Sequence, residues 1–227
     1  GTARAYTDIG LLTDDPVLCE DIHKVFLQLT GLGQAASLER LLSSPFTLNR
    51  RLAEMIQFES NEAKAGRPGR IIVKANSLSE PAMIRNLYRA SQDGVKIDLI
   101  IRGICCLRPG VPGLSENITV ISIIGRFLEH SRVFYFYAAG EEKLYCSSAD
   151  WMSRNLYRRV EVAFPLENPN HRQRILEEAL HKPLKDNSEA WVLQPDGTYI
   201  QRSPNGQREN RSQIELLHEL SELGPSE

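Results

Sequence analysis

One of the five histidines, His130, stands between two arginines in the segment RFLEHSRVFYF (126–136), where a polar stretch runs into aromatic and β-branched residues. An imidazole there can attack phosphorus, donate a proton to a leaving oxygen or hold a phosphoryl oxygen, because its unperturbed pKa lies near neutrality. A lone histidine is more often a structural or surface residue. The chemical interpretation of His130 therefore depends on which residues the fold brings to it.

Further basic residues lie on both sides of His130 and of the segment SSADWMSRN (147–155). They are Arg126, Arg132, Arg154, Arg158 and Arg159. Runs of charge often mark a solvated face, but these residues flank short turns at strand ends. This arrangement favours a basic cleft for a polyanion, to which Ser148 and Asn155 would add phosphate contacts.

A carboxylate in the segment RVEVAF (159–164) follows the same cluster. Strand alternation can simply turn Glu161 toward solvent. The alternative is a buried carboxylate that fixes the tautomer of an imidazole and stabilises its cation.

The clearest structural unit is a strand, a helix and a second strand. RIIVKANS predicts a buried strand over 70–75, LSEPAMIRNLYRASQDG a helix capped by Ser79, and VKIDLIIRG a buried strand over 95–102. Continuous Ile, Val and Leu in both strands indicate a parallel crossover. Lys74, Asn76 and Arg102 would then meet at the carboxyl edge of the sheet, where α/β folds bind ligands. A guanidinium at that edge suits bidentate contact with phosphate.

The rest of the chain alternates between strand and helix patterns, so we predict a mixed α/β fold. Two amphipathic helices are expected in DDPVLCEDIHKVFLQLTGLG and SSPFTLNRRLAEMIQFESNEAKAGRPG, the second ending at Gly66. Strands are expected at 118–125, 132–138, 142–148 and 158–166. A helix in NPNHRQRILEEALHK, a hairpin at LQPDGTYI and a short helix in QIELLHELSEL follow.

Composition narrows the possible functions. The chain has 227 residues, 41% of them hydrophobic and 25% charged, and the sequence has no apolar run long enough to span a bilayer. A net charge of −2 gives no global attraction to polyanions, so an anion site must be a local cleft. The sequence contains no P-loop, HExxH or CxxC motif and four cysteines without metal spacing, so we predict no dedicated metal site and expect reduced thiols in the cytoplasm.

Taken together, the chain resembles the C-terminal part of a polyphosphate kinase of the type related to phospholipase D. The resemblance runs from TARAYTD and LLTDDP through KAGRPGRIIVKANSL, SQDGVKIDLIIRGICCLRPGVPGLSENI, IIGRFLEHSRVFYF and SSADWMSRN to QPDGTY. It implies a phospholipase D-like mixed sheet flanked by helices. Residues 46–227 would form the C-terminal catalytic domain, and residues 1–45 a helical remnant of the preceding catalytic domain.

The resemblance also implies an activity. In this family the terminal phosphate of ATP moves reversibly to a histidine and then onto a polyphosphate chain. Its ATP contacts fall on Tyr6, Arg102 and His130, and the resemblance gives His130, Arg102, Arg132 and Glu161 catalytic roles, with Glu161 orienting the imidazole. Further candidates for phosphate or polyphosphate contacts are Lys74, Asn76, Arg126, Ser148, Asn155 and Arg158.

The family's phosphorylated histidine, and two arginines associated with Mg²⁺, lie upstream of the segment that matches TARAYTD. We therefore expect this chain alone not to complete turnover. ATP or ADP and inorganic polyphosphate are the implied partners, and Mg²⁺ would enter with ATP. A homo-oligomer is implied for the full-length enzyme, and a cytoplasmic location is expected, with membrane association left open.

Two alternatives remain. A phospholipase D-like phosphodiesterase would use an H-x-K motif, a G-S-x-N turn and a downstream glutamate, but here Arg132, Ser147 and Asp150 replace the lysine, glycine and asparagine. A non-catalytic module could instead bind polyanions through the arginines. Nucleic acid is disfavoured as its ligand, because the net charge is slightly negative and the sequence lacks an aromatic-rich basic stripe.

Overall fold

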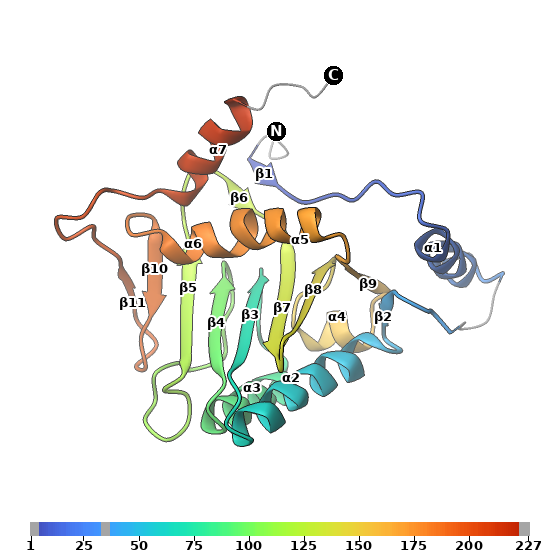
Figure 1. Cartoon of the computed structure of the whole chain (residues 1–227), viewed down its shortest axis with the longest axis horizontal. Helices are drawn as coiled ribbons and strands as arrows, with labels where there is room; N and C mark the ends of the chain where they lie inside the picture. Colours follow the sequence, from blue (N-terminus) through green and yellow to red (C-terminus); the bar gives the residue numbers. More distant parts are fainter. Residues whose placement is uncertain (1–4, 33–36, 223–227) are drawn as a thin grey trace.

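The computed structural model describes residues 5–32 and 37–222 of the chain. Within these residues a nine-stranded mixed sheet forms the centre of the molecule, flanked by helices, which confirms the predicted fold class. The strands follow the order β11–β10–β5–β4–β3–β7–β8–β9–β2 across the sheet (Figure 1). Their bounds are Leu42–Ser44 (β2), Gly69–Ala75 (β3), Lys96–Ile101 (β4), Ile118–Ile123 (β5), Arg132–Ala138 (β7), Glu141–Ser147 (β8), Glu161–Pro165 (β9), Ala190–Leu193 (β10) and Tyr199–Gln201 (β11).

The middle of the sheet is parallel, from β3 through β4 to β5, and the pairs on either side are antiparallel. Helix α3 (Pro81–Gln92) connects β3 to β4, so the predicted crossover is confirmed. The predicted cap, Ser79, is wrong by one residue. Because Pro81 occupies the first helical position, the residue before it is the cap, and the side chain of Glu80 accepts a hydrogen bond from the Met83 N–H at 2.6 Å.

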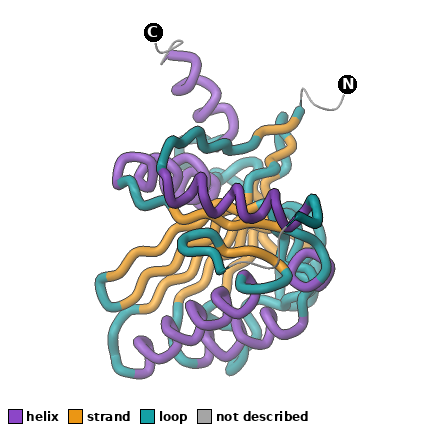
Figure 2. The backbone as a smooth tube through the Cα atoms, turned by 90° about the vertical axis from the view of Figure 1, so that its right-hand side faces the viewer, coloured by secondary structure: helices purple, strands orange, loops and turns teal. Residues whose placement is uncertain are grey.

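Helices cover both faces of the sheet (Figures 1 and 2). Helix α2 (Leu48–Lys64) and α3 pack on one face through a large apolar cluster that includes Leu48, Leu52 and Leu87. The other face is covered by α5 (Pro169–Ile175), the π-helix η2 (Leu176–His181) and α6 (Lys182–Lys185), which run on from one another. Alternating strand residues thus enter opposite clusters, as the pleat of a sheet requires.

Two predicted strands prove shorter than the sequence pattern suggested. β5 ends at Ile123, because Ile124 is 61% exposed and the chain leaves the sheet there. β9 begins only at Glu161, after the short helix α4 (Ser153–Tyr157) and the exposed residues that follow it. Both predicted hairpins are confirmed, β7–β8 and β10–β11.

A second, two-stranded sheet lies beyond the carboxyl ends of β3 and β4. It pairs β1 (Tyr6–Thr7) with β6 (Leu128–Glu129) in parallel, and helix α7 (Ser212–Glu222) lies at the same end of the molecule (Figure 1). Helix α1 (Pro16–Leu29) forms as predicted, but Phe26 and Leu29 are 61% and 56% exposed. None of the described helices is long and apolar enough to cross a membrane.

Candidate functional site

A pocket of about 560 Å³ opens where β3, β4 and β7 meet the small β1–β6 sheet. Residues from several separate segments line it, among them ten that the sequence singled out: Tyr6, Asn76, Arg102, His130, Arg132, Ser148, Arg154, Asn155, Arg159 and Glu161. The parallel strands explain part of this convergence, since their carboxyl ends share one edge. The hairpin β7–β8 and helix α4 bring the remainder.

The position of His130, which lies between β6 and β7, is set by contacts with β1 and the residue that follows it. The His130 N–H donates to the carbonyl of Thr7 at 2.8 Å, and the imidazole Nδ1 lies 2.8 Å from Oδ2 of Asp8. The ring of Tyr6 meets the imidazole edge to face, with centroids 5.4 Å apart. Because an ionised carboxylate only accepts hydrogen bonds, the Asp8 contact places the proton on Nδ1. Nε2 is then the ring nitrogen that carries the free lone pair, and Nη1 of Arg132 lies 3.1 Å from it.

Glu161 makes no hydrogen bond with His130 within the described residues, so its expected role in orienting the imidazole is not supported by this geometry. Its carboxylate accepts hydrogen bonds from Ser148 Oγ at 2.5 Å and Asn155 Nδ2 at 2.6 Å. It therefore organises the turn before α4. The carboxylate at the imidazole is Asp8, which lies 122 residues from His130 and belongs to the TARAYTD segment.

Arg132 is held in a nearly buried ion pair with Asp150, whose side chains are 10% and 4% exposed. Its Nε and Nη2 each lie 3.2 Å from an oxygen of Asp150, while Nη1 donates to the His130 carbonyl at 2.7 Å. The same Nη1 is 3.1 Å from both imidazole nitrogens. Asp150 also accepts the N–H groups of Asn76 and Ser77 at 2.8 and 3.2 Å. This carboxylate therefore joins the end of β3 to the start of β7 beneath the imidazole.

Arg102 keeps part of its hydrogen-bonding capacity free. Its Nη2 donates a hydrogen bond to the side-chain oxygen of Asn76, as expected for two residues at the same edge of the sheet. The Nε of Arg102, however, is buried and has no hydrogen-bond partner within the described ranges. A buried donor without a partner is costly, and it points to a bound acceptor such as a phosphate oxygen.

Three predicted candidates lie outside this pocket. Lys74 forms a nearly buried ion pair with Glu129 and lines a neighbouring cavity. Arg126 is exposed, with its guanidinium 5.4 Å from the centre of the Phe127 ring. Arg158 is exposed and its neighbour Arg159 lines the pocket instead, together with Arg154.

Cys146 also lines the pocket, but its chemistry is restricted. Burial, with a smaller contribution from the charge of Asp8, raises the pKa of the Cys146 thiol to about 12. The thiol therefore stays protonated near neutral pH and cannot serve as a thiolate nucleophile. Among the described residues, no three His, Cys, Asp or Glu side chains come close enough to hold a metal ion.

Known proteins are similar to this chain in sequence and in fold. Residues 41–213 match the family model described as polyphosphate kinase C-terminal domain 2. The chain is 56% identical over 216 residues to the polyphosphate kinase of Paraburkholderia phytofirmans and 55% identical over 222 residues to that of Pseudomonas aeruginosa. These alignments cover 95% and 97% of this chain but 31% and 32% of the relatives. The chain belongs to the polyphosphate kinase family.

The structure of a more distant family member agrees. The crystal structure of polyphosphate kinase from Porphyromonas gingivalis superposes with a TM-score of 0.88 at 36% identity, covering 93% of this chain and 32% of that one. The chain thus spans about a third of the length of the polyphosphate kinases that it matches. The resemblance drawn from the sequence is confirmed at the level of the family, and the pocket around His130 lies in a polyphosphate kinase domain.

Proposed function

We propose that the pocket around His130 is the part of a polyphosphate kinase active site that this chain contributes. There the terminal phosphoryl group of ATP would pass, through a phosphohistidine supplied by another part of the enzyme, to a polyphosphate chain and back. The carrying observation is that Arg102, whose buried Nε has no hydrogen-bond partner among the described residues, lines the same pocket as His130. A phosphoryl group is an acceptor that satisfies both.

Arg102, His130 and Arg132 each have a distinct role in this transfer. Arg102 binds a phosphate oxygen and neutralises charge that develops on the transferring group. His130, with its Nδ1 proton held by Asp8, offers Nε2 as a base or, once protonated, as a donor to the leaving oxygen. Arg132, fixed by Asp150, supplies positive charge beside the ring without needing to move. The site is thus pre-organised for charge that appears during transfer.

Mg²⁺ would accompany the nucleotide, as it does for most ATP-dependent phosphoryl transfer. The pocket carboxylates Asp8, Asp150 and Glu161 are each engaged by groups of the protein itself. These residues do not form a metal cage, so we assign no metal ligand to this chain. We further propose that residues 1–45 belong with the preceding part of the enzyme and reach the pocket through Tyr6 and Asp8.

Titration calorimetry with ATP-Mg and, separately, with long-chain polyphosphate tests the binding half of this proposal. Wild type is expected to bind both, and Arg102→Ala and His130→Ala to weaken ATP-Mg binding by about 1–3 kcal/mol each, as loss of a charged hydrogen bond should. The matched control is Arg67→Ala, because Arg67 precedes the opposite end of β3 and is paired with Glu62. Polyphosphate binding that is equal in all variants, with no ATP binding, would instead indicate a simple polyanion-binding module.

Transfer itself is tested in a chimera, in which this chain replaces the matching third of a full-length relative. Wild-type chimera should form polyphosphate from ATP, and the His130→Ala chimera should lose most of that rate. A His130→Ala chimera as fast as wild type would exclude His130 from the chemistry.

A further inference from the structure

The segment that carries His130 is an excursion from the sheet. After Ile123 the chain leaves β5, forms β6 and returns only at Arg132, so residues 124–131 lie outside the main sheet. Ile124, Gly125 and Arg126 are exposed. A short exposed excursion of this kind needs contacts with other parts of the chain to hold one conformation.

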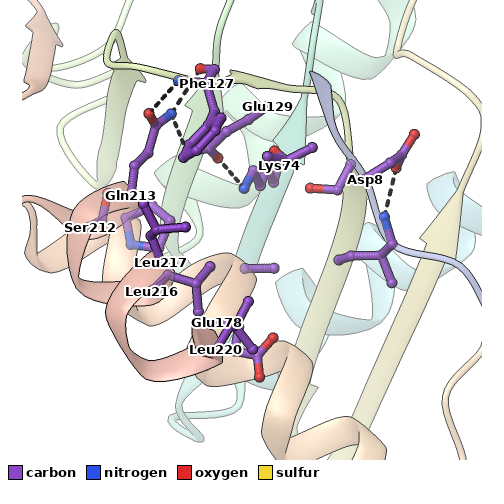
Figure 3. A pocket seen from close by; sticks show the side chains of 15 residues that line it. Asp8, Lys74, Phe127, Glu129, Glu178, Ser212, Gln213, Leu216, Leu217 and Leu220 are labelled. Carbon is purple, nitrogen blue, oxygen red and sulfur yellow. Dashed lines mark hydrogen bonds and ion pairs between the residues drawn. The ribbon is translucent and has the colours of Figure 1, made fainter. Parts of the chain in front are cut away.

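Gln213, in the first turn of α7, supplies such contacts (Figure 3). Its side-chain oxygen accepts the Phe127 N–H at 2.8 Å, and its Nε2 donates to the Phe127 carbonyl at 2.9 Å. The same Nε2 lies 3.0 Å from Oε1 of Glu129. The amide therefore forms hydrogen bonds with both backbone groups of Phe127, as a neighbouring strand would. The Gln213 residue is only 5% exposed.

The helix that carries Gln213 is itself fixed to the domain. The N–H and hydroxyl of Ser212 donate to the buried carboxylate of Asp186 at 2.7 and 2.8 Å. Farther along α7, Glu219 pairs with Lys182 at 2.6 Å. The helix that presents the amide of Gln213 is therefore attached to the rest of the domain at two points.

Apolar packing alone does not hold the excursion at this place. Between α7 and the excursion lies a cavity of about 220 Å³, whose walls include Phe127, Leu216, Leu217, Leu220 and Ile9 (Figure 3). Open volume beside Phe127 forfeits the dispersion contacts that a close-packed core would give. The directional contacts of the amide therefore carry more of the positioning than they would in a filled core.

Gly125 shows how closely the Gln213 side chain approaches the excursion. We call the hydrogen bonds of Gln213 to Phe127 and Glu129 the amide clamp. A Cβ atom at this position would lie 2.6 Å from the Gln213 side-chain oxygen and 2.5 Å from Oε2 of Glu189. Any other residue at 125 would therefore require the side chains of Gln213 and Glu189 to shift. A glycine here fits the close approach of both side chains.

The contacts continue from Gln213 to the site. Glu129, which accepts from Gln213, is also paired with Lys74 of β3, so the clamp ties β6 to the centre of the sheet. β6 in turn pairs with β1, which carries Tyr6 and precedes Asp8. Both residues contact the imidazole of His130.

We propose that Gln213 is a positioning residue for the phosphoryl-transfer site, acting through β6 and β1 to hold Tyr6, Asp8 and His130 in register. This inference rests on the proposed function for its importance to catalysis, but not for its geometry. It assigns helix α7, most of which lies beyond the residues matched by the family model, a role at the site.

The test uses the chain labelled with ¹⁵N-histidine, with the His130 signal assigned from His130→Gln. In wild type the Asp8 contact should give well-separated ring nitrogens of the Nδ1-protonated tautomer. Gln213→Ala should move them toward the average of exchanging tautomers and weaken ATP-Mg binding on the order of tenfold, the value of one or two hydrogen bonds. Gln213→Glu keeps the acceptor but loses both donated bonds and adds a carboxylate beside Glu129, so it should give no rescue.

Two further variants keep the test decisive. Gly125→Ala leaves α7 intact and should reproduce the His130 signature by pushing the amide away. Gln92→Ala is the matched control, since this amide of α3 also donates to a backbone carbonyl, that of Gly113 at 2.9 Å. It should leave the His130 signal unmoved and change affinity less than about twofold.

The outcomes separate the two proposals. Unchanged His130 signals in both Gln213→Ala and Gly125→Ala overturn the positioning role, whatever the chain binds. If wild type fails to bind ATP-Mg while the His130 signals still move in both variants, the positioning role stands and the proposed function fails.

Discussion

Strands β3 and β4 are stabilised in one way along their length and in another at their carboxyl edge. Their length is covered by α2 and α3 through an apolar cluster of many residues between Leu42 and Leu193, including Leu48, Leu52 and Leu87, all 0% exposed. Their carboxyl edge is held by a few polar contacts between distant segments, chiefly those of Asp150 and Gln213. Apolar burial is non-directional and spread over many atoms, whereas an ion pair or amide clamp depends on each partner. Substitutions in the apolar cluster should therefore lower stability gradually, whereas substitutions among the polar contacts at the carboxyl edge should lower it abruptly.

The largest expected effect comes from the most connected polar group. Asp150→Ala leaves the nearly buried guanidinium of Arg132 without its carboxylate and two backbone N–H groups without an acceptor. Removing one partner of a buried pair costs about 3–5 kcal/mol. We expect the free energy of unfolding, measured with urea, to fall by about that amount, and ATP-Mg binding to be lost with it.

Leu52→Ala is the comparison in the apolar layer. It should cost about 2–5 kcal/mol of unfolding free energy, because it leaves a cavity in a packed cluster. Affinity for ATP-Mg should be unchanged at temperatures where the variant is folded. If Asp150→Ala lowered stability but left affinity intact, the contrast between the two regions would disappear.

The contrast between the two regions also explains which contacts could be predicted from the sequence. The β3–α3–β4 unit follows from local patterns of apolar residues, and its parallel strands correctly bring Arg102 to Asn76. Lys74 was expected beside them, but it lies two residues before Asn76, roughly 7 Å back along the strand, and shares only a small cavity with Arg102. There it meets Glu129 instead of the pocket.

The contacts of His130 could not be predicted in this way. Its partner Asp8 lies 122 residues away, and no periodicity links the two. The sequence offered Glu161 for the role because it follows the same basic cluster, but the β8–β9 register turns its carboxylate toward Ser148 and Asn155. Pairings that close such long loops are properties of the whole fold rather than of any local pattern.

A buried carboxylate within the apolar layer gives a smaller effect. Glu59 of α2 is 2% exposed and accepts the Arg70 N–H at 3.0 Å. Burial raises the pKa of Glu59 to about 7. Because the pKa is higher in the folded state than in the unfolded chain, the stabilisation is fully present below about pH 4.5 and is lost as the pH rises through 7.

We therefore expect the free energy of unfolding to contain a component that falls by up to about 3 kcal/mol between pH 4.5 and 8, because the carboxyl group holds its proton more tightly in the folded state than in the unfolded chain. Glu59→Gln should remove that fall in urea titrations repeated across this range. The control is Glu62→Gln on the same helix. The Arg67 hydrogen bond lowers the pKa of Glu62, so its contribution disappears only toward acid pH. Equal pH profiles for Glu59→Gln and wild type would contradict the assignment.

The smallest effect separates two adjacent arginines at the edge. Both belong to the basic cluster named from the sequence, but Arg159 lines the pocket while Arg158, the one of the two chosen as a polyphosphate contact, does not. Neither forms an ion pair with a carboxylate in residues 5–32 and 37–222, so both are free to attract phosphate. Direct contact and general attraction should nevertheless differ, since the attraction between exposed charges is screened within about 10 Å at 0.1 M salt.

Arg159→Ala should weaken tripolyphosphate binding by about 1–2 kcal/mol, the value of a hydrogen bond to a charged group, and Arg158→Ala by less than about 0.5 kcal/mol. Calorimetric titrations at two salt concentrations distinguish the two contributions, because the Arg158 effect should vanish at high salt and the Arg159 effect should persist in part. Equal losses for both variants would mean that the arginines act only through their summed field. Arg159 would then make no direct contact with phosphate, and the polar edge of the sheet would bind phosphate no more specifically than any basic surface.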